Sequence, residues 1–470
     1  MTGGATLTQN TGESYGTFGY RTYVLITLTV VYTFNFIDRI LISVVGGPII
    51  EEFGLSNFEF GILSGIGFAL FYTALGIPIA SYSERSSRVR IIGVCVILWS
   101  IATVLCGFTV GFFTLLLARL AVGVGEAGCT PPANSLISDY YTPRARATAL
   151  GTYAMGVTVG GLLAQLFGGS ILQFFSWREA FIYIGAPGLL LGVIVLMTVK
   201  EPPRGYSDPP GAKKPEKASF RNALSELMQR PTFWYITFGA TLASFAGYSL
   251  TSFHPLWFQY LFGYSAGETA IRFMALLGVA ASISAFLGGF LVEKASVRSE
   301  TAPCWVAGIA LIVCGPIAAV GFLSNSLTFA MAAFLLGGLL QYFYVGAMYN
   351  VAQAVVSLTV RATAIAILLF VVNLIGYGLG PPFVGFVADA FTSSAINASA
   401  YAGQIDVGCS IRDPELSGEL VEACKTAKGY GVRMACTIAC VLFSVGGGLF
   451  MLGTRTYVAD EAANKLPATA

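Results

Sequence analysis

The tetrapeptide Arg146-Ala-Thr-Ala149 recurs as Arg361-Ala-Thr-Ala364, and each copy stands at the start of a long apolar stretch. A second pair of similar segments, Ala80-Ser-Tyr-Ser-Glu84-Arg85 and Gly289-Phe-Leu-Val-Glu293-Lys294, ends two other apolar stretches. The copies are 215 and 209 residues apart, which is nearly half of the 470-residue chain. The sequence therefore predicts two similar halves that share one orientation.

The composition is typical of a polytopic membrane protein. Hydrophobic residues make up 55% of the chain and charged residues 11%, whereas soluble proteins contain about 25% charged residues. The net charge of +2 creates no field that attracts a polyanion, so we expect no nucleic acid as a partner. A single histidine and nine scattered cysteines without a Cys-x-x-Cys pair argue against a metal site, and we expect neither a metal nor a bound cofactor. A disordered chain and most soluble enzymes are excluded.

Twelve stretches are long and apolar enough to cross a bilayer, which takes about 20 residues. The first 20 residues are polar and lack the features of a signal peptide, so we expect a cytosolic tail. The predicted spans are 21–46, 58–82, 90–110, 112–138, 145–173, 177–199, 231–262, 267–292, 301–323, 326–356, 362–390 and 428–453.

The distribution of Lys and Arg predicts the orientation of these spans. With the N-terminus inside, 18 basic residues fall on cytoplasmic segments and six on outer segments. Because cytoplasmic loops of membrane proteins are enriched in Lys and Arg, we expect both termini in the cytoplasm. The expected location is the plasma (inner) membrane, with the lipid bilayer as surroundings and a monomeric chain.

The fold class predicted is an all-α membrane protein with twelve transmembrane helices in two six-helix bundles, a 6+6 parallel repeat. A Pro-rich, charged linker separates the halves, and the apolar spacing of residues 220–228 in it predicts an amphipathic surface helix. The predicted parts are a tail (1–20), a first bundle (21–199), the linker (200–230), a second bundle (231–455) with an outer loop (391–427), and a tail (456–470).

Four ionisable residues lie inside spans of the first half: Asp38 and Arg39 in span one, and Arg119 and Glu126 in span four. Each costs about 2.5–3.5 kcal/mol at the bilayer centre, so they should face one another or a water-filled cavity. Asp38 and Arg119 both fall roughly 10–12 Å below the outer edge, which favours a pair between them. Glu126 lies about 10 Å deeper, near the midplane.

A carboxyl group beside an arginine at this depth is suited to carrying a proton. Burial favours the protonated carboxyl group, whereas the neighbouring cation favours the carboxylate. Asp38 and Glu126 are the proton-coupling candidates, which the sequence does not rank. Arg39 and Arg119 are the candidates for binding an anionic head group. The alternative is a static ion pair that fixes helix packing.

The second half is nearly uncharged inside its spans and rich in aromatic and amide side chains. A charged first half beside an apolar second half suggests a small amphiphilic anion as substrate. The candidates for a substrate cavity are Asn35, Tyr248, Tyr342, Tyr349 and Asn373.

Two further sets of residues lie at the membrane surfaces. Charged residues at the cytoplasmic mouth are candidates for a gate, since surface ion pairs of about 0–1 kcal/mol are easily made and broken. Cys409 and Cys424 fall in the outer loop, where an oxidising environment favours a disulfide. The gate candidates are Glu84, Arg85, Arg146, Glu293, Lys294 and Arg361.

The twelve spans, the 6+6 repeat and the loop at residues 80–90 resemble the major facilitator superfamily. The usual loop pattern of that family is Gly-x-x-x-Asp-Arg/Lys-x-Gly. This chain departs from it, since Ala80, Glu84 and Ser87 replace the first Gly, the Asp and the second Gly.

Within the superfamily, the first half resembles the Spinster group, whose eukaryotic members are linked to export of sphingosine-1-phosphate and transport of lysophospholipids. The short loops look like those of a bacterial homologue. The resemblance implies a lipid-like substrate and roles for Asp38, Arg39, Arg119 and Glu126 in coupling and head-group binding. It rests on Asn35-Phe-Ile-Asp38-Arg39, Arg119-Leu-Ala-Val-Gly123-Val-Gly-Glu126-Ala127, Pro132-Ala-Asn-Ser-Leu-Ile-Ser-Asp139 and Ser176-Trp177-Arg178-Glu-Ala-Phe181.

These features together predict a secondary active transporter that works by alternating access, uses the proton gradient and moves an amphiphilic lipid. A transporter of small organic anions or drugs is one alternative. A membrane receptor that binds without net transport is another. An enzyme is not expected, because no set of nucleophile and base is visible.

Overall fold

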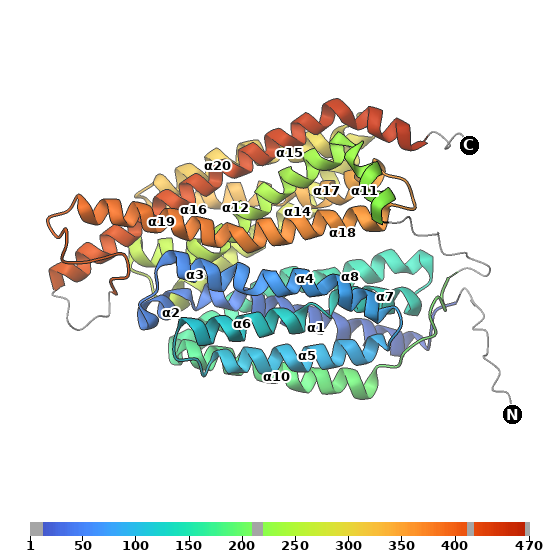
Figure 1. Cartoon of the computed structure of the whole chain (residues 1–470), viewed down its shortest axis with the longest axis horizontal. Helices are drawn as coiled ribbons and strands as arrows, with labels where there is room; N and C mark the ends of the chain where they lie inside the picture. Colours follow the sequence, from blue (N-terminus) through green and yellow to red (C-terminus); the bar gives the residue numbers. More distant parts are fainter. Residues whose placement is uncertain (1–12, 209–219, 411–417, 466–470) are drawn as a thin grey trace. The chain divides into compact units, whose positions relative to one another are not determined.

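The computed structural model describes residues 13–208, 220–410 and 418–465, and these residues are folded almost entirely into helices (Figure 1). Parts of the predicted tails, linker and outer loop therefore lie outside the described residues. Eleven helical stretches are long and apolar enough to cross a membrane. The other predicted span, 231–262, is the 32-residue helix α12 (Pro231–Phe262), which carries several Ser and Thr side chains. The all-α fold class is confirmed.

Packing divides the chain into two compact units. Unit 1 comprises 1–41, 70–164 and 175–214, and unit 2 comprises 42–69, 165–174 and 215–470. The helices that lie wholly or mostly in unit 1 are α1 (Phe18–Val44), α4 (Ile66–Ser83), α5 (Arg88–Cys106), α6 (Phe112–Glu126), α7 (Thr130–Tyr140), α8 (Pro143–Leu163) and α10 (Trp177–Thr198).

Unit 2 contains α12 and most of the second half, together with two short segments of the first half. Its α-helices besides α12 are α2 (Gly46–Phe53), α3 (Asn57–Ser64), α9 (Gly169–Phe174), α11 (Phe220–Met228), α13 (Ala266–Thr269), α14 (Ala275–Ser296), α15 (Ala302–Leu323), α16 (Leu327–Gln341), α17 (Phe343–Ala354), α18 (Arg361–Val371), α19 (Gly380–Asn397) and α20 (Gly418–Lys465).

Small residues explain why a segment of the first half packs within unit 2. A Cβ added at Gly385 of α19 collides with the backbone of Asn57, and one added at Gly61 of α3 collides with the backbone of Pro381. These helices can approach this closely only because no side chain stands between them. Packing therefore divides the chain differently from the predicted boundary at residue 200.

Two helix starts use the same capping device at equivalent places of the repeat. The hydroxyls of Ser56 and Ser265 accept hydrogen bonds from the backbone N–H groups of Glu59 and Glu268, at 3.2 Å each. Both glutamates accept bonds in return from the serine backbone N–H, which completes a capping box. The two serines are 209 residues apart, the same spacing as the second pair of repeated segments.

Three predicted spans contain a π-helical segment: η1 (Ala164–Gly168), η2 (Ala270–Met274) and η3 (Val372–Leu379). Such segments are rare and often mark functional positions in helices. The division between the units falls inside η1, between Ala164 and Gln165. Span five thus changes its packing partners where its hydrogen-bonding pattern changes.

The helix α11 coincides with the amphipathic segment predicted at 220–228. Ala223 and Leu227 are buried against unit 2, whereas Phe220 and Met228 are each 66% exposed. The carboxylate of Glu226 accepts hydrogen bonds from the backbone N–H and the hydroxyl of Ser357, at 2.7 and 2.9 Å. This contact anchors α11 to the turn between α17 and α18.

Gly447 and Gly448 of α20 offer a matched test of this close packing. A Cβ added at Gly447 lies 2.5 Å from the carbonyl oxygen of Gly308 and 2.8 Å from the nitrogen of Ile312, whereas nothing lies within 4 Å of one added at Gly448. We expect Gly447→Ala to lower the free energy of unfolding by about 1–3 kcal/mol, because α15 and α20 must separate. Gly448→Ala should not lower it and should raise it by about 0.5–1 kcal/mol, because the space is open and alanine favours a helix more than glycine does. Thermal unfolding in detergent measures both, and equal unfolding midpoints for the two variants would contradict this packing.

Candidate functional site

A buried ion pair joins two helices of unit 1. The Nη2 of Arg39 on α1 lies 2.9 Å from Oε2 of Glu126 on α6, and their side chains are 5% and 0% exposed. Both charged groups have lost their hydration. The ion pair therefore compensates this cost only if the two groups meet in good hydrogen-bonding geometry. The sequence identified both residues as site candidates, but its depth estimate favoured a different pair, Asp38 with Arg119.

Asp38 and Arg119 lie beside this ion pair and are also buried, at 3% and 1% exposure. Asp38 accepts a hydrogen bond of 2.8 Å from the hydroxyl of Thr103 on α5. Arg119 interacts electrostatically with both Asp38 and Glu126. Two carboxyl groups and two guanidinium groups thus lie together in the interior of unit 1, and we call them the charge cluster: Asp38, Arg39, Arg119 and Glu126.

The rest of the surroundings of Arg39 comes mainly from its own helix. The Nη2 of Arg39 donates to Oδ1 of Asn35 at 3.5 Å, one turn earlier on α1. Its guanidinium lies over the rings of Phe36 and Tyr72, 4.7 and 4.6 Å from their centroids. Such cation–π contacts stabilise a desolvated cation by about 2 kcal/mol. Asn35, predicted to line a substrate cavity, therefore belongs to the charge cluster's surroundings.

Helical spacing and small residues assemble the charge cluster. Arg119 and Glu126 are seven residues apart on α6 and so share one face of that helix. A Cβ added at Gly125 lies 2.7 Å from Trp99 of α5, and one added at Gly128 collides with the thiol of Cys95. These glycines admit α5, which brings Thr103 within reach of Asp38.

The burial of the charge cluster links the loss of an ion-pair partner to protonation of a carboxyl group. Removing one partner of a buried ion pair costs about 3–5 kcal/mol, because the other charge remains buried and uncompensated. A carboxyl group in that position avoids the cost by taking up a proton. Any ligand anion that binds Arg39 or Arg119 therefore changes the proton affinity of the neighbouring carboxylates.

A second cluster of site candidates lies in unit 2. The rings of Tyr248 on α12 and Tyr377 in η3 lie 4.4 Å apart. The hydroxyl of Tyr344 shares a hydrogen bond of 2.9 Å with Ser244, and Tyr248, Tyr342 and Tyr349 surround it electrostatically. We call these residues the tyrosine cluster: Tyr248, Tyr342, Tyr344, Tyr349 and Tyr377. Three of the five were predicted as cavity residues.

Asn373, the other cavity candidate, lies in η3 one turn before Tyr377 and is half-buried. The hydroxyls of the tyrosine cluster and this amide provide neutral hydrogen-bonding groups among apolar side chains. A surface of this kind suits the apolar and hydroxyl-bearing part of an amphiphile.

Two of the predicted gate residues, Arg146 and Arg361, form polar contacts in the structure. Arg146 binds Asp208 at 2.9 Å and the carbonyl of Ser138 at 2.8 Å. The Nε of Arg361 donates to the carbonyl of Gln353 at 2.9 Å. The remaining four candidates, Glu84, Arg85, Glu293 and Lys294, are exposed. The acidic residue that Arg146 contacts is therefore a linker residue, not Glu84 or Glu293.

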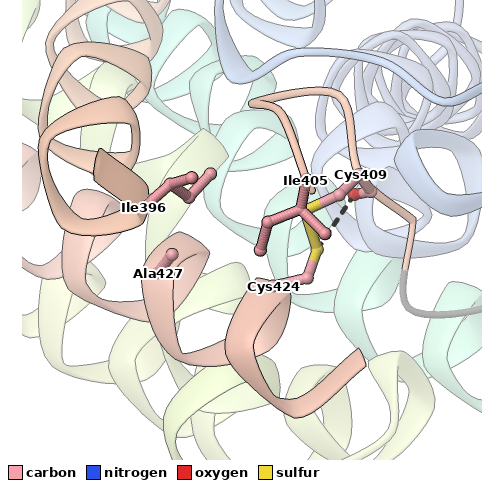
Figure 2. Close-up of a cluster of buried hydrophobic side chains, with 5 residues drawn as sticks. All are labelled: Ile396, Ile405, Cys409, Cys424 and Ala427. Atoms are coloured by element: carbon pink, nitrogen blue, oxygen red, sulfur yellow. Dashed lines mark hydrogen bonds between the residues drawn. A yellow bond between two sulfur atoms is a disulfide. The ribbon is translucent and has the colours of Figure 1, made fainter. Parts of the chain in front are cut away.

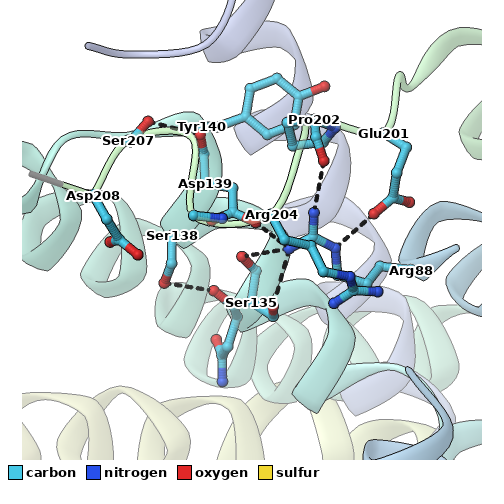
Figure 3. Close-up of polar contacts among 12 residues, drawn as sticks. Arg88, Ser135, Ser138, Asp139, Tyr140, Glu201, Pro202, Arg204, Ser207 and Asp208 are labelled. Atoms are coloured by element: carbon cyan, nitrogen blue, oxygen red, sulfur yellow. Dashed lines mark hydrogen bonds and ion pairs between the residues drawn. The ribbon is translucent and has the colours of Figure 1, made fainter. Parts of the chain in front are cut away.

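Sequence reasoning did not identify Arg88, a buried cation with several bonding partners at the start of α5 (Figure 3). Its guanidinium forms ion pairs with Asp139 of α7 and, at 2.6 Å, with Glu201. It also donates to the carbonyl oxygens of Ser135 and Pro202 at 3.1 and 3.0 Å. The available signal was a basic residue directly after Ser87, whose hydroxyl caps α5.

Cys409 and Cys424 form a disulfide. Figure 2 shows it beside the side chains of Ile396, Ile405 and Ala427, which are all buried. The bond thus ties the loop after α19 to the start of α20.

The comparisons with known proteins agree on the family of this chain. Residues 28–381 match the family model of the Major Facilitator Superfamily. The structure is similar to the crystal structure of a bacterial homologue of the human lysosomal transporter Spinster, in an inward-facing and unoccupied conformation. The TM-score is 0.87 and the identity is 42%, over 95% of this chain and 99% of that chain.

Two similar proteins are named for different kinds of transport. An MFS-type efflux pump of Mycolicibacterium smegmatis is 28% identical over 365 residues, which are 78% of this chain and 84% of the pump. The sphingosine-1-phosphate transporter SPNS2 of Mus musculus is 24% identical over 380 residues, which are 77% of this chain and 68% of the relative.

Arg88 and Arg90 of α5 allow a test of the Arg88 network. Arg88→Met leaves Asp139 and Glu201 without their cation, so we expect the free energy of unfolding to fall by about 3–5 kcal/mol. Arg90 is exposed, and Arg90→Met should change stability by less than about 0.5 kcal/mol. Thermal unfolding of the purified variants distinguishes them, and an unchanged midpoint for Arg88→Met would show that the network does not stabilise unit 1.

Proposed function

Because the chain belongs to the major facilitator superfamily and is a membrane transporter of the Spinster type, we propose that it moves an amphiphilic anionic lipid by alternating access, coupled to protons. The observation that carries this proposal is the charge cluster, in which the buried guanidinium of Arg39 binds Glu126. An anionic ligand would compete with Glu126 for this guanidinium. Sphingosine-1-phosphate and lysophospholipids are the substrates of this class that we favour. One similar protein is by name a sphingosine-1-phosphate transporter.

The head group of such a lipid needs a cation, and the charge cluster contains the buried cations Arg39 and Arg119. A guanidinium binds phosphate through two parallel hydrogen bonds, which favours arginine over lysine at such a site. In unit 2, the hydroxyls and rings of the tyrosine cluster suit the hydroxyl-bearing and apolar part of an amphiphile. The substrate specificity thus divides into a charged part and an apolar part.

Proton coupling follows from competition for the same guanidinium. When a phosphate displaces Glu126 from Arg39, the buried carboxylate is left uncompensated, and protonation removes that charge. Asp38, which shares the field of Arg119, is the second carboxyl group that can respond in this way. Competition of this kind lets the anion and the proton occupy the site together, so the two cross in the same direction.

The proposal also includes the oligomeric state, the membrane and the energy source of the transporter. The transporter works as a monomer in the plasma (inner) membrane, with both termini in the cytoplasm, and the proton gradient takes the place of a cofactor. The disulfide between Cys409 and Cys424 fits this orientation, because it then faces the oxidising side of the membrane.

A second candidate is the export or uptake of drug-like molecules or small organic anions. It is favoured by the relative that is named an efflux pump. The two candidates differ in whether a long apolar tail is required for binding. A receptor that binds without transport makes the same contacts but gives no flux.

Flux in proteoliposomes tests the proposal. A fluorescent sphingosine-1-phosphate analogue is supplied on one side, and its movement is compared with and without an imposed pH gradient. Movement that depends on the gradient supports a proton-coupled lipid transporter. If a short-chain phosphate competes as well as the lipid does, the substrate is a small anion, and absence of all flux by folded protein argues for a receptor.

Glu126→Gln removes the titrating group while keeping the shape of the side chain. We expect it to reduce gradient-dependent flux at least tenfold while the protein remains folded, because the amide cannot exchange a proton. The control is Glu300→Gln, which changes an exposed glutamate and should transport at the rate of the unmodified chain. Full gradient-dependent flux in Glu126→Gln would falsify the role of Glu126 as a proton carrier.

Arg119→Ala distinguishes head-group binding from general support of the site. Loss of a charge-assisted hydrogen bond costs about 1.5–3 kcal/mol, so binding of an anionic lipid should weaken at least tenfold. Binding of a neutral analogue, in which a hydroxyl replaces the phosphate, should change much less. Binding titrations with both lipids measure this, and an equal loss for the two would contradict a head-group contact.

A further inference from the structure

The disulfide-bonded loop of unit 2 contacts a segment that is distant from it in the sequence. The hydroxyl of Ser410, directly after Cys409, donates to the carbonyl oxygen of Glu51 at 3.1 Å and to its carboxylate at 2.9 Å. A Cβ added at Gly408 lies 3.6 Å from the carbonyl of Gly54, so the loop also lies against the turn between α2 and α3. This turn connects predicted spans one and two.

A buried lysine lies behind the same contact. Lys428, four residues after Cys424 on α20, is 1% exposed. Three carboxylates act on it electrostatically, those of Glu51, Asp389 and Asp406, which belong to α2, α19 and the loop. A buried ammonium group is costly unless anions compensate its charge. The charge of Lys428 therefore attracts the acidic residues of α2, α19 and the loop.

Asp389 connects this point to α3. Its carboxylate accepts hydrogen bonds from the backbone N–H groups of Asn57 and Phe58, at 3.0 and 2.8 Å, and from the amide of Asn57 at 2.8 Å. The first N–H groups of a helix have no partners within that helix, and a carboxylate satisfies them well. The start of α3 is therefore bound to α19 by the same acid that faces Lys428.

We propose that Lys428 and the Cys409–Cys424 disulfide form a latch that holds α2 and α3 closed against α19 and α20. The disulfide, drawn in Figure 2, fixes the loop from which Ser410 bonds to Glu51. Lys428 lies in the field of Glu51, Asp389 and Asp406 and so attracts the elements that carry them. Alternating access requires the connection between spans one and two to leave this position on the predicted outer side. The strength of the latch then sets the balance between the closed and the open state.

The latch goes beyond the proposed substrate and coupling, and its test needs no substrate. Hydrogen–deuterium exchange of the full chain in lipid nanodiscs reports local opening at segments 46–60 and 88–106. Lys428→Met removes the charge and keeps most of the side-chain volume. The matched control is Lys425→Met, which removes a half-exposed charge one turn earlier on α20. The disulfide is tested by reduction and alkylation of the unmodified protein and by Cys409→Ser with Cys424→Ser.

We expect Lys428→Met to speed exchange in 46–60 about tenfold, with no change in 88–106. Reduction of the disulfide should have a similar effect, and Lys425→Met should have none. The latch is overturned if 46–60 exchanges at the unmodified rate in Lys428→Met and in reduced protein, since the disulfide then closes only its own loop. An equal increase in 46–60 and 88–106 also overturns it, because that result reports general destabilisation.

Discussion

Charges buried in an apolar bundle must compensate one another, and this constraint shapes unit 1. Arg39 and Glu126 form an ion pair with almost no exposure, and Asp38 and Arg119 are buried beside it. Helix α1 supplies one acid and one base, and α6 supplies the same. Neither helix could shift without separating opposite charges in a medium of low dielectric constant. The constraint that fixes the helices also makes the site sensitive to any incoming anion or proton.

Small residues impose the complementary constraint. Gly125 admits α5 to the charge cluster, Gly61 and Gly385 bring α3 against α19, and Gly308 meets Gly447 between α15 and α20. Apolar side chains contribute little to association between helices within lipid, so close backbone contact and buried polar bonds supply the specificity. Unit 2 adds the contacts of Asp389 and Lys428, which bind a segment of the first half to the second. Charges and glycines thus determine which helices contact one another in each unit.

Much of the fold follows from the sequence alone. Apolar runs predicted the helices, and repeated segments predicted the two halves. The free-energy cost of placing charges in a membrane identified Asp38, Arg39, Arg119 and Glu126 as site candidates. Four ionisable residues within apolar spans must have their charges compensated. The pairing among them was not predictable, because depth along a helix does not give the rotation of the helix about its axis. The guanidinium of Arg39 lies at bonding distance from Glu126.

The remaining differences have similar physical causes. Arg88 was missed because its partners, Asp139 and Glu201, are far away in the sequence and only packing brings them together. Arg146 was predicted as a gate residue, and its pairing with Asp208 of the linker was not foreseen because the two are distant in the sequence. The division into units was not foreseen because it depends on individual glycines of α3 and α19, whose contacts no apolar pattern reveals.

The central claim is that an anionic head group and Glu126 compete for one buried guanidinium, so that binding and protonation are linked. Calorimetric titration of the purified protein with sphingosine-1-phosphate, in buffers of different ionisation enthalpy, measures the number of protons exchanged on binding. The account predicts uptake of about one proton per lipid bound near neutral pH, since the displaced carboxylate must be neutralised. Tight binding with no proton exchanged would contradict it, because Glu126 would then remain charged beside the bound anion.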